Sequence, residues 1–188
     1  MFFKVHREYL REYKKSETFS GILNGGRYNC VTGVALYGYL LTELGYKPKI
    51  FETRFHIFLI VDFPDIGQIL FEATDPQQGF VSNQNEVQKR IAKYLLEEQH
   101  QLANPRMFSA PFNNSCVFKA VTLKEVAGLH YYNLAVDLSN NGHFYDAFRA
   151  CKKAGILYPQ SVRIKHLTLY IESKFRLELS KLFAANLE

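Results

Sequence analysis

The stretch that decides the fold is GRYNCVTGVALYGYLLTELGYK, residues 26–47. From Val31 onward, apolar side chains recur at helical spacing and also fill the other faces of the helix, a pattern typical of a helix that is buried all round. Gly45 is a natural end for this helix, because glycine readily adopts the left-handed conformation that follows a last turn. Pro48 prevents its continuation. The sequence therefore predicts a central, buried helix.

A cysteine opens this helix. Cys30 follows Asn29, a favourable N-cap, and the Gly25–Gly26 pair lets the chain bend sharply into the first turn. The N–H groups and the positive dipole end of a first turn stabilise a thiolate, whereas a cysteine beside an apolar helix is more often a small core residue. Cys30 is therefore a candidate nucleophile, provided that a base lies nearby.

Three runs rich in β-branched and aromatic residues follow the helix and predict strands. They cover residues 49–55, 56–62 and 68–74. Residues 63–67, FPDIG, have the composition of a tight turn, so the second and third runs are expected to form an antiparallel hairpin. A central helix followed by an antiparallel sheet predicts an α+β fold. Residues 2–15 and 88–102 read as further helices.

The expected hairpin brings a histidine and a carboxylate together. If it is symmetric about a turn centred between Asp65 and Ile66, His56 lies opposite Asp75. Directly opposed residues have Cβ atoms about 4.5 to 5.5 Å apart on the same face, which suits an imidazole held by a carboxylate. In this register Glu72 has the other parity and points to the opposite face.

Cys30, His56 and Asp75 thus follow the logic of a nucleophile, a base and an orienting group. His56 would take the proton of the thiol or form a thiolate–imidazolium pair, and Asp75 would fix its tautomer. The backbone N–H of Cys30 would donate to the oxyanion. The pattern predicts a Cys-His-Asp catalytic triad.

These motifs resemble a known family. Residues 28–63, YNCVTGVALYGYLLTELGYKPKIFETRFHIFLIVDF, and residues 69–76, ILFEATDP, look like the core of the transglutaminase-like superfamily, whose fold is related to papain. The resemblance implies Cys30, His56 and Asp75 as the triad, and peptidase, amidase or acyl-transferase chemistry through a Cys30 thioester on a protein or peptide substrate.

One departure from the family concerns the oxyanion. The classical enzymes carry Trp directly after the cysteine, but this chain has Val31 there and contains no Trp. The second oxyanion donor is therefore open among three nearby residues, Tyr28, Asn29 and Asn24.

The C-terminal part follows a different pattern. Counting back from Pro159 over a 34-residue helix-turn-helix unit, the large and small core positions resemble one tetratricopeptide repeat. These positions are Tyr131, Leu134, Ala135, Leu138, Ala147, Cys151 and Ala154. Residues 161–185 read as a following helix, and such segments sometimes accompany transglutaminase-like domains in bacterial proteins. We expect a transglutaminase-like domain over residues 1–120 and a helical, tetratricopeptide-like segment over residues 121–188, which offers a surface for a protein partner.

Charge and cysteine spacing argue against other classes. The net charge of +5 comes from 23 Lys and Arg against 18 Asp and Glu. Basic residues occur at most as pairs such as Lys14–Lys15, with acids nearby, which is not the patch that nucleic acid requires. Cys116 and Cys151 form neither a CxxC pair nor a disulfide framework with Cys30. We expect no metal and no organic cofactor.

The N-terminus lacks the apolar run of a signal peptide, and no segment reaches the length of a membrane span, so a cytoplasmic chain without membrane contact is expected. A different class of function also fits the sequence. A chain that kept this fold but lost catalysis would be a binding module, holding a protein or peptide in its cleft or on its helical tail. The missing Trp favours that alternative, which predicts a Cys30 that titrates as an ordinary thiol.

Overall fold

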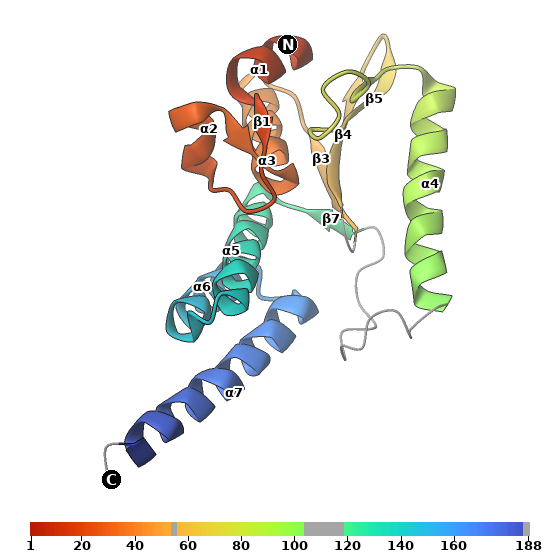
Figure 1. Ribbon diagram of the computed structural model, residues 1–188. Coiled ribbons are helices and arrows are strands. Elements are labelled where there is room, and N and C mark those ends of the chain that lie inside the picture. The colour runs from red at the N-terminus through yellow and green to blue at the C-terminus, as the bar shows by residue number, and fades with distance from the viewer. Residues whose placement is uncertain (54–55, 104–118, 186–188) are drawn as a thin grey trace. The chain divides into compact units, whose positions relative to one another are not determined.

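The computed structural model describes residues 1–53, 56–103 and 119–185, and it combines helices with an antiparallel sheet, as predicted for an α+β fold (Figure 1). The chain divides into two compact units, Met1–Leu123 and Lys124–Glu188. Along the first unit the elements are α1 (Phe2–Tyr9), β1 (Glu12–Tyr13), α2 (Phe19–Gly25), β2 (Arg27–Tyr28), α3 (Cys30–Glu43), β3 (Lys49–Glu52), β4 (Ile57–Phe63), β5 (Gly67–Phe71), β6 (Phe80–Val81), α4 (Gln84–Ala103) and β7 (Lys119–Val121).

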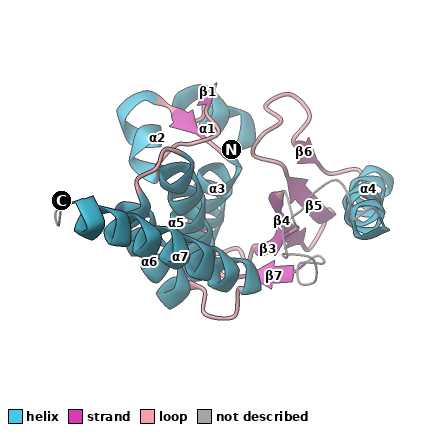
Figure 2. Ribbon diagram, turned by 60° about the horizontal axis from the view of Figure 1, so that its bottom comes forward, coloured by secondary structure: helices cyan, strands magenta, loops and turns pink. Residues whose placement is uncertain are grey.

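The main sheet of the first unit has five strands in the order β6-β5-β4-β3-β7, and all its pairs are antiparallel. Helix α3 lies on one side of this sheet and α4 on the other (Figure 2). On the α4 side, a core forms from Phe58, Ile60, Leu70, Val81 and Val87. The strands are buried on both faces, because each face is covered by an apolar helix side.

The central helix has the predicted ends. Helix α3 begins at Cys30 and ends at Glu43, and Gly45 just beyond it has a φ of 84°, the left-handed region that favours glycine. Near the middle of α3, Tyr37 is fully buried, stacks on Phe2 with ring centroids 5.2 Å apart and donates a hydrogen bond to the Phe2 carbonyl. Helix α1 is thereby packed onto α3.

The register of the β4–β5 hairpin differs from the prediction by one residue. Asp62 pairs with Gln68 rather than with Ile69, because the loop contains three residues, 64–66, and Gly67 starts β5 with a φ of 86°. A shift of one residue reverses which side chains share a face. Glu72, and not Asp75, therefore comes to the face of His56.

The N-terminal segment also departs from the prediction. The helix expected over residues 2–15 ends at Tyr9, and the chain continues as β1, which pairs with β2 in parallel. Tyr13 lies opposite Tyr28 in this two-stranded sheet. The backbone N–H groups of Arg11 and Glu12 both donate to the carbonyl of Gly26, a partner that is distant in sequence.

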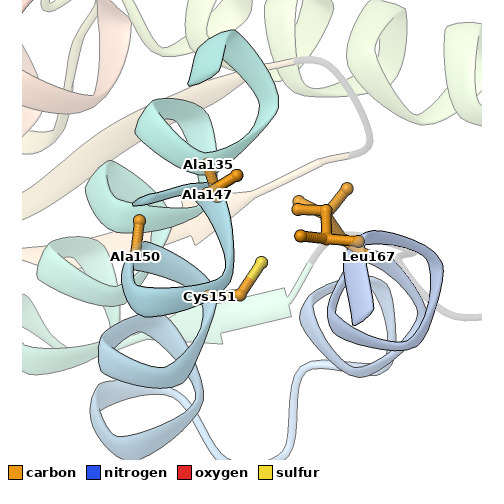
Figure 3. Packing of buried hydrophobic residues seen from close by; sticks show 6 residues of the cluster. Ala135, Ala147, Ala150, Cys151 and Leu167 are labelled. Atoms are coloured by element: carbon orange, nitrogen blue, oxygen red, sulfur yellow. The ribbon is translucent and has the colours of Figure 1, made fainter. Parts of the chain in front are cut away.

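The second unit consists of helices. Helix α5 (Leu123–Asn140) begins at the last residue of the first unit, and α6 (Phe144–Leu157) and α7 (Val162–Ala185) follow. Their shared core contains Ala135, Ala147, Ala150, Cys151, Leu167 and Ile171 (Figure 3). Ala154 is fully buried as well, so small residues let α5 and α6 approach closely. In the described part of the chain, no helix combines the length and the apolar character that crossing a membrane requires.

Candidate active site

Asn29 fixes the start of the helix that carries Cys30. Its side-chain Oδ1 accepts a hydrogen bond from the Thr32 backbone N–H at 2.9 Å, and its own backbone N–H donates to Thr32 Oγ1 at 2.9 Å. This reciprocal pair is a capping box, which satisfies N–H groups that the first turn would otherwise leave unpaired. Cys30 is held at the positive end of α3 and is partly exposed.

The three candidate oxyanion donors lie in different environments. The amide Nδ2 of Asn29 donates to the carbonyls of Lys15 and Glu17, at 3.4 and 3.1 Å, so both of its N–H groups are engaged. Tyr28 is buried, and Asn24 lies exposed on α2. Asn29 therefore organises the helix start and has no side-chain donor left for a substrate.

The first turn of α3 packs tightly against the chain just after β5. A Cβ atom placed on Gly33 would lie 2.9 Å from the Ala73 Cβ and 3.2 Å from Tyr28 Cδ2, closer than atoms normally approach. Only glycine permits this contact. Because residues three apart lie on the same face of a helix, Cys30 is on the face of α3 that meets Ala73. Glu72, the residue before Ala73, bonds to Tyr94 of α4.

His56 is bonded to Glu72. Its Nε2 forms a hydrogen bond with Glu72 Oε2, and the two side chains are 22% and 5% exposed. The backbone of His56 is fixed by Thr53, whose N–H donates to the His56 carbonyl at 2.8 Å and whose Oγ1 accepts from the His56 N–H at 3.0 Å. Among the described residues, Nδ1 of His56 has no hydrogen-bond partner, and it is the nitrogen left for a proton transfer.

Glu72 is itself surrounded by donors. Tyr94 of α4 donates its hydroxyl to Oε2 at 2.9 Å. Thr74 donates both its backbone N–H and its hydroxyl to Oε1, at 3.0 and 2.7 Å. Burial alone would raise the pKa of Glu72, but the hydrogen bond and charge of His56, with the bonds from Thr74, lower the pKa overall. The carboxylate is thus buried, ionised and fixed in orientation.

The carboxylate bonded to His56 is that of Glu72 rather than the expected Asp75, whose hydrogen bonds among the described residues go elsewhere. Asp75 Oδ1 accepts from the Gln78 backbone N–H at 2.8 Å, and its Oδ2 lies 3.5 Å from Arg90 Nη1. The bond to Gln78 closes the turn between β5 and β6, and the bond to Arg90 joins this turn to α4. The reason is the shorter hairpin loop, which brings the parity of Glu72 to His56 and carries the chain into a turn before Asp75.

Neither Glu72 nor Tyr94 was predicted from the sequence to belong to this site. Glu72 was assigned to the wrong face through the register. Tyr94 had a detectable signal, since Val87, Ile91 and Tyr94 recur at helical spacing and pack on the same cluster of the sheet. Its ring centroid lies 5.0 Å from that of His56, so α4 covers the imidazole as well as the carboxylate.

Cys30 is one of three cysteines in the chain. Cys151 is buried in the second unit, where burial raises the pKa of its thiol, and Cys116 lies outside the described residues. Within the described ranges, no group of three or more His, Cys, Asp or Glu residues is arranged to hold a metal ion.

Comparisons with models of protein families, with curated proteins and with solved structures found no match for this chain.

Proposed function

We propose that the first unit is a cysteine enzyme of transglutaminase-like type that hydrolyses or transfers an acyl group from an amide. Cys30 is the nucleophile, His56 the base, and Glu72 replaces Asp75 as the orienting carboxylate. The observation that carries the proposal is the hydrogen bond between His56 Nε2 and the buried carboxylate of Glu72. A buried carboxylate with so many donors is well suited to hold an imidazole in one tautomer.

The hydrogen bond between His56 and Glu72 indicates which nitrogen of His56 accepts the proton in this proposal. Because Glu72 accepts from Nε2–H, the lone pair of neutral His56 lies on Nδ1. Nδ1 takes the proton of the Cys30 thiol, and the imidazolium that results is stabilised by the carboxylate. The start of α3 favours the thiolate in the same step.

The acyl transfer then follows the usual course of thiol catalysis. The thiolate sulfur attacks the carbonyl carbon of the amide, His56 returns the proton from Nδ1 to the amine, and the carbon–nitrogen bond breaks. The acyl group remains on Cys30 as a thioester. Water or a second amine attacks the thioester, gives up its proton to His56 and releases the acid or the new amide. The chemistry needs no cofactor beyond these side chains.

The chain order supports the family assignment. A helix that starts at the cysteine, a strand that starts after the histidine and a carboxylate just after the next strand occur in this order here. The resemblance of residues 28–63 and 69–76 rests on the same order. A Glu in place of the expected Asp keeps the chemistry of the carboxylate and adds one methylene of reach.

The rate of alkylation by iodoacetamide, followed against pH and assigned by peptide mass mapping, tests the proposal. We expect Cys30 in the wild type to react with an apparent pKa well below the ordinary thiol value of about 8.5, and His56→Ala to abolish that shift. Cys151 is the internal control, since its burial keeps it slow in both proteins. An unchanged profile of Cys30 in His56→Ala would contradict the enzyme and leave a binding module as the better description.

A further inference from the structure

The segment after α1 lies beside the two residues that precede Cys30. The Lys14 backbone N–H donates to the Tyr28 carbonyl at 2.7 Å, and the Asn29 side chain donates to the Lys15 carbonyl. The parallel β1–β2 pairing places Tyr13 directly opposite Tyr28. Residues 13–15 are therefore held beside residues 28–29 by backbone and side-chain bonds, immediately before the helix that Cys30 opens.

The ring of Tyr13 has a defined position in this arrangement. It packs edge-on against the ring of Tyr28, with centroids 5.7 Å apart and an interplanar angle of 90°. Tyr28 in turn packs on Gly33, the residue that meets Ala73 next to Glu72. Tyr13 remains 51% exposed, so its ring is anchored by Tyr28 and still meets solvent.

The Tyr13 hydroxyl keeps its proton at neutral pH. Partial burial raises the pKa of Tyr13, and the negative charges of Cys30 and Glu72 raise this pKa further. The hydroxyl therefore stays protonated at neutral pH and acts as a donor. Among the described residues it has no hydrogen-bond partner of its own.

We propose that the Tyr13 hydroxyl is the second oxyanion donor, hydrogen-bonding the carbonyl oxygen of an acyl group under attack by Cys30. This inference rests on the proposed function of the Cys30 site. Tyr13 fills the role that a Trp after the cysteine would have in the classical enzymes. The other candidates fit less well, because Asn29 has both amide N–H groups engaged and Tyr28 is buried beneath Tyr13.

The role is one of charge stabilisation. When the thiolate attacks, a carbon–sulfur bond forms and the electron pair of the carbonyl moves onto the oxygen. The Tyr13 O–H shortens its hydrogen bond to this oxyanion and keeps its proton. The electron pair returns when the leaving group departs, so Tyr13 ends each step unchanged. Loss of one such donor typically costs about 100-fold to 1,000-fold in rate.

Two reagents separate this role from a general effect on the thiol. p-Nitrophenyl acetate acylates Cys30 through an oxyanion and releases p-nitrophenolate. The thiolate displaces iodide from the carbon of iodoacetamide, and this reaction forms no oxyanion. In Tyr13→Phe we expect acylation to fall by about tenfold or more, with less than about twofold change in alkylation. Tyr39→Phe is the matched control, because Tyr39 is 53% exposed on α3 and should change neither rate.

The outcomes distinguish a failure of the Tyr13 role from a failure of the proposed enzyme. If acylation and alkylation fall together in Tyr13→Phe, or if neither falls, Tyr13 is not an oxyanion donor. If the wild type acylates no faster than Cys30→Ser, the proposed enzyme itself fails, and the oxyanion role fails with it. A thermal unfolding midpoint measured on each variant separates a loss of acylation from a loss of fold.

Discussion

The carboxylate of Glu72 and the imidazole of His56 lie on the same face of the sheet and are hydrogen-bonded through Nε2. The pair depends on the three-residue loop between β4 and β5, since a loop of one more or one fewer residue would turn Glu72 away. Tyr94 of α4 packs on this same face and binds the same carboxylate oxygen as His56. The position of the Glu72 carboxylate thus depends both on the register of β5 and on the packing of α4.

Replacing Glu72 by Gln should weaken the base. The amide keeps the size of the side chain but removes the negative charge that stabilises imidazolium. We expect the apparent pKa of Cys30 to rise toward the ordinary thiol value, and its alkylation at pH 7 to slow about tenfold. The pH profile of iodoacetamide alkylation measures both effects.

Asp75→Asn is the matched control for Glu72→Gln. It makes the same chemical change three residues away, at a carboxylate that contacts Gln78 and Arg90 instead of His56. We expect the alkylation profile of Cys30 to stay unchanged. A profile that shifts in Asp75→Asn and not in Glu72→Gln would restore the triad first expected from the sequence.

His6 should make the folded chain less stable as the pH falls. Both of its ring nitrogens are buried without a hydrogen-bond partner among the described residues, next to the rings of Phe2, Tyr28 and Tyr37. Burial lowers the pKa of His6, although a backbone interaction and the charge of Asp75 act in the other direction. The unfolded chain therefore binds a proton at higher pH than the folded chain does, and stability present above about pH 6.5 is lost below it.

The free energy of unfolding in urea, measured at several pH values between about 7 and 5, tests this effect of His6. His6→Phe should show a weaker decline with falling pH, since the ring is kept and the titration is removed. His143→Gln, at an exposed histidine, should keep the wild-type decline. The half-buried His130 contributes equally to all three proteins, so an identical decline in His6→Phe and wild type would contradict the role of His6.

Gly33→Ala should disturb the contact between α3 and the end of β5. The added methyl group would lie 2.9 Å from the Ala73 Cβ, so the first turn of the helix must shift. Overpacking of this kind costs about 1 to 3 kcal/mol of unfolding free energy, and the shift should also slow alkylation of Cys30. Gly155→Ala on α6 is the control, because no atom lies within 4 Å of its added Cβ, and it should stabilise the helix by about 0.5 to 1 kcal/mol. Equal unfolding midpoints for the two variants would contradict the close contact at Gly33.

The predictable parts of the fold were those specified by nearby residues. The apolar run after Cys30, the cap at Asn29 and the glycine at position 45 define α3 locally, and the structure confirms its start and its left-handed end. The hairpin was likewise predictable from two β-rich runs around a turn. Its register was not, because residues 63–67 accommodate loops of either parity and the choice reverses the face of Glu72.

The rest of the site depends on contacts between distant segments. Residues 11–14 have a helical composition, but their backbone groups bond to Gly26 and Tyr28, which ends α1 at Tyr9. A two-residue strand carries almost no local signal, so the position of Tyr13 beside Tyr28 follows only from the tertiary fold. Tyr94 reaches Glu72 for the same kind of reason, from a helix on the opposite side of the sheet from α3.

The side chain of Asn29 links two segments of the first unit. One amide group holds the first turn of α3 through Thr32 and also fastens the carbonyls of Lys15 and Glu17. The segment that contains Lys15 and Glu17, here called the N-terminal arm, and the first turn of α3 therefore open together, as one cooperative unit in native-state hydrogen exchange. Exchange of the Thr32 amide proton measures this opening, since the proton exchanges only when its hydrogen bond to the Asn29 side chain is broken. Opening of the first helical turn at Cys30 and release of the N-terminal arm are thus coupled.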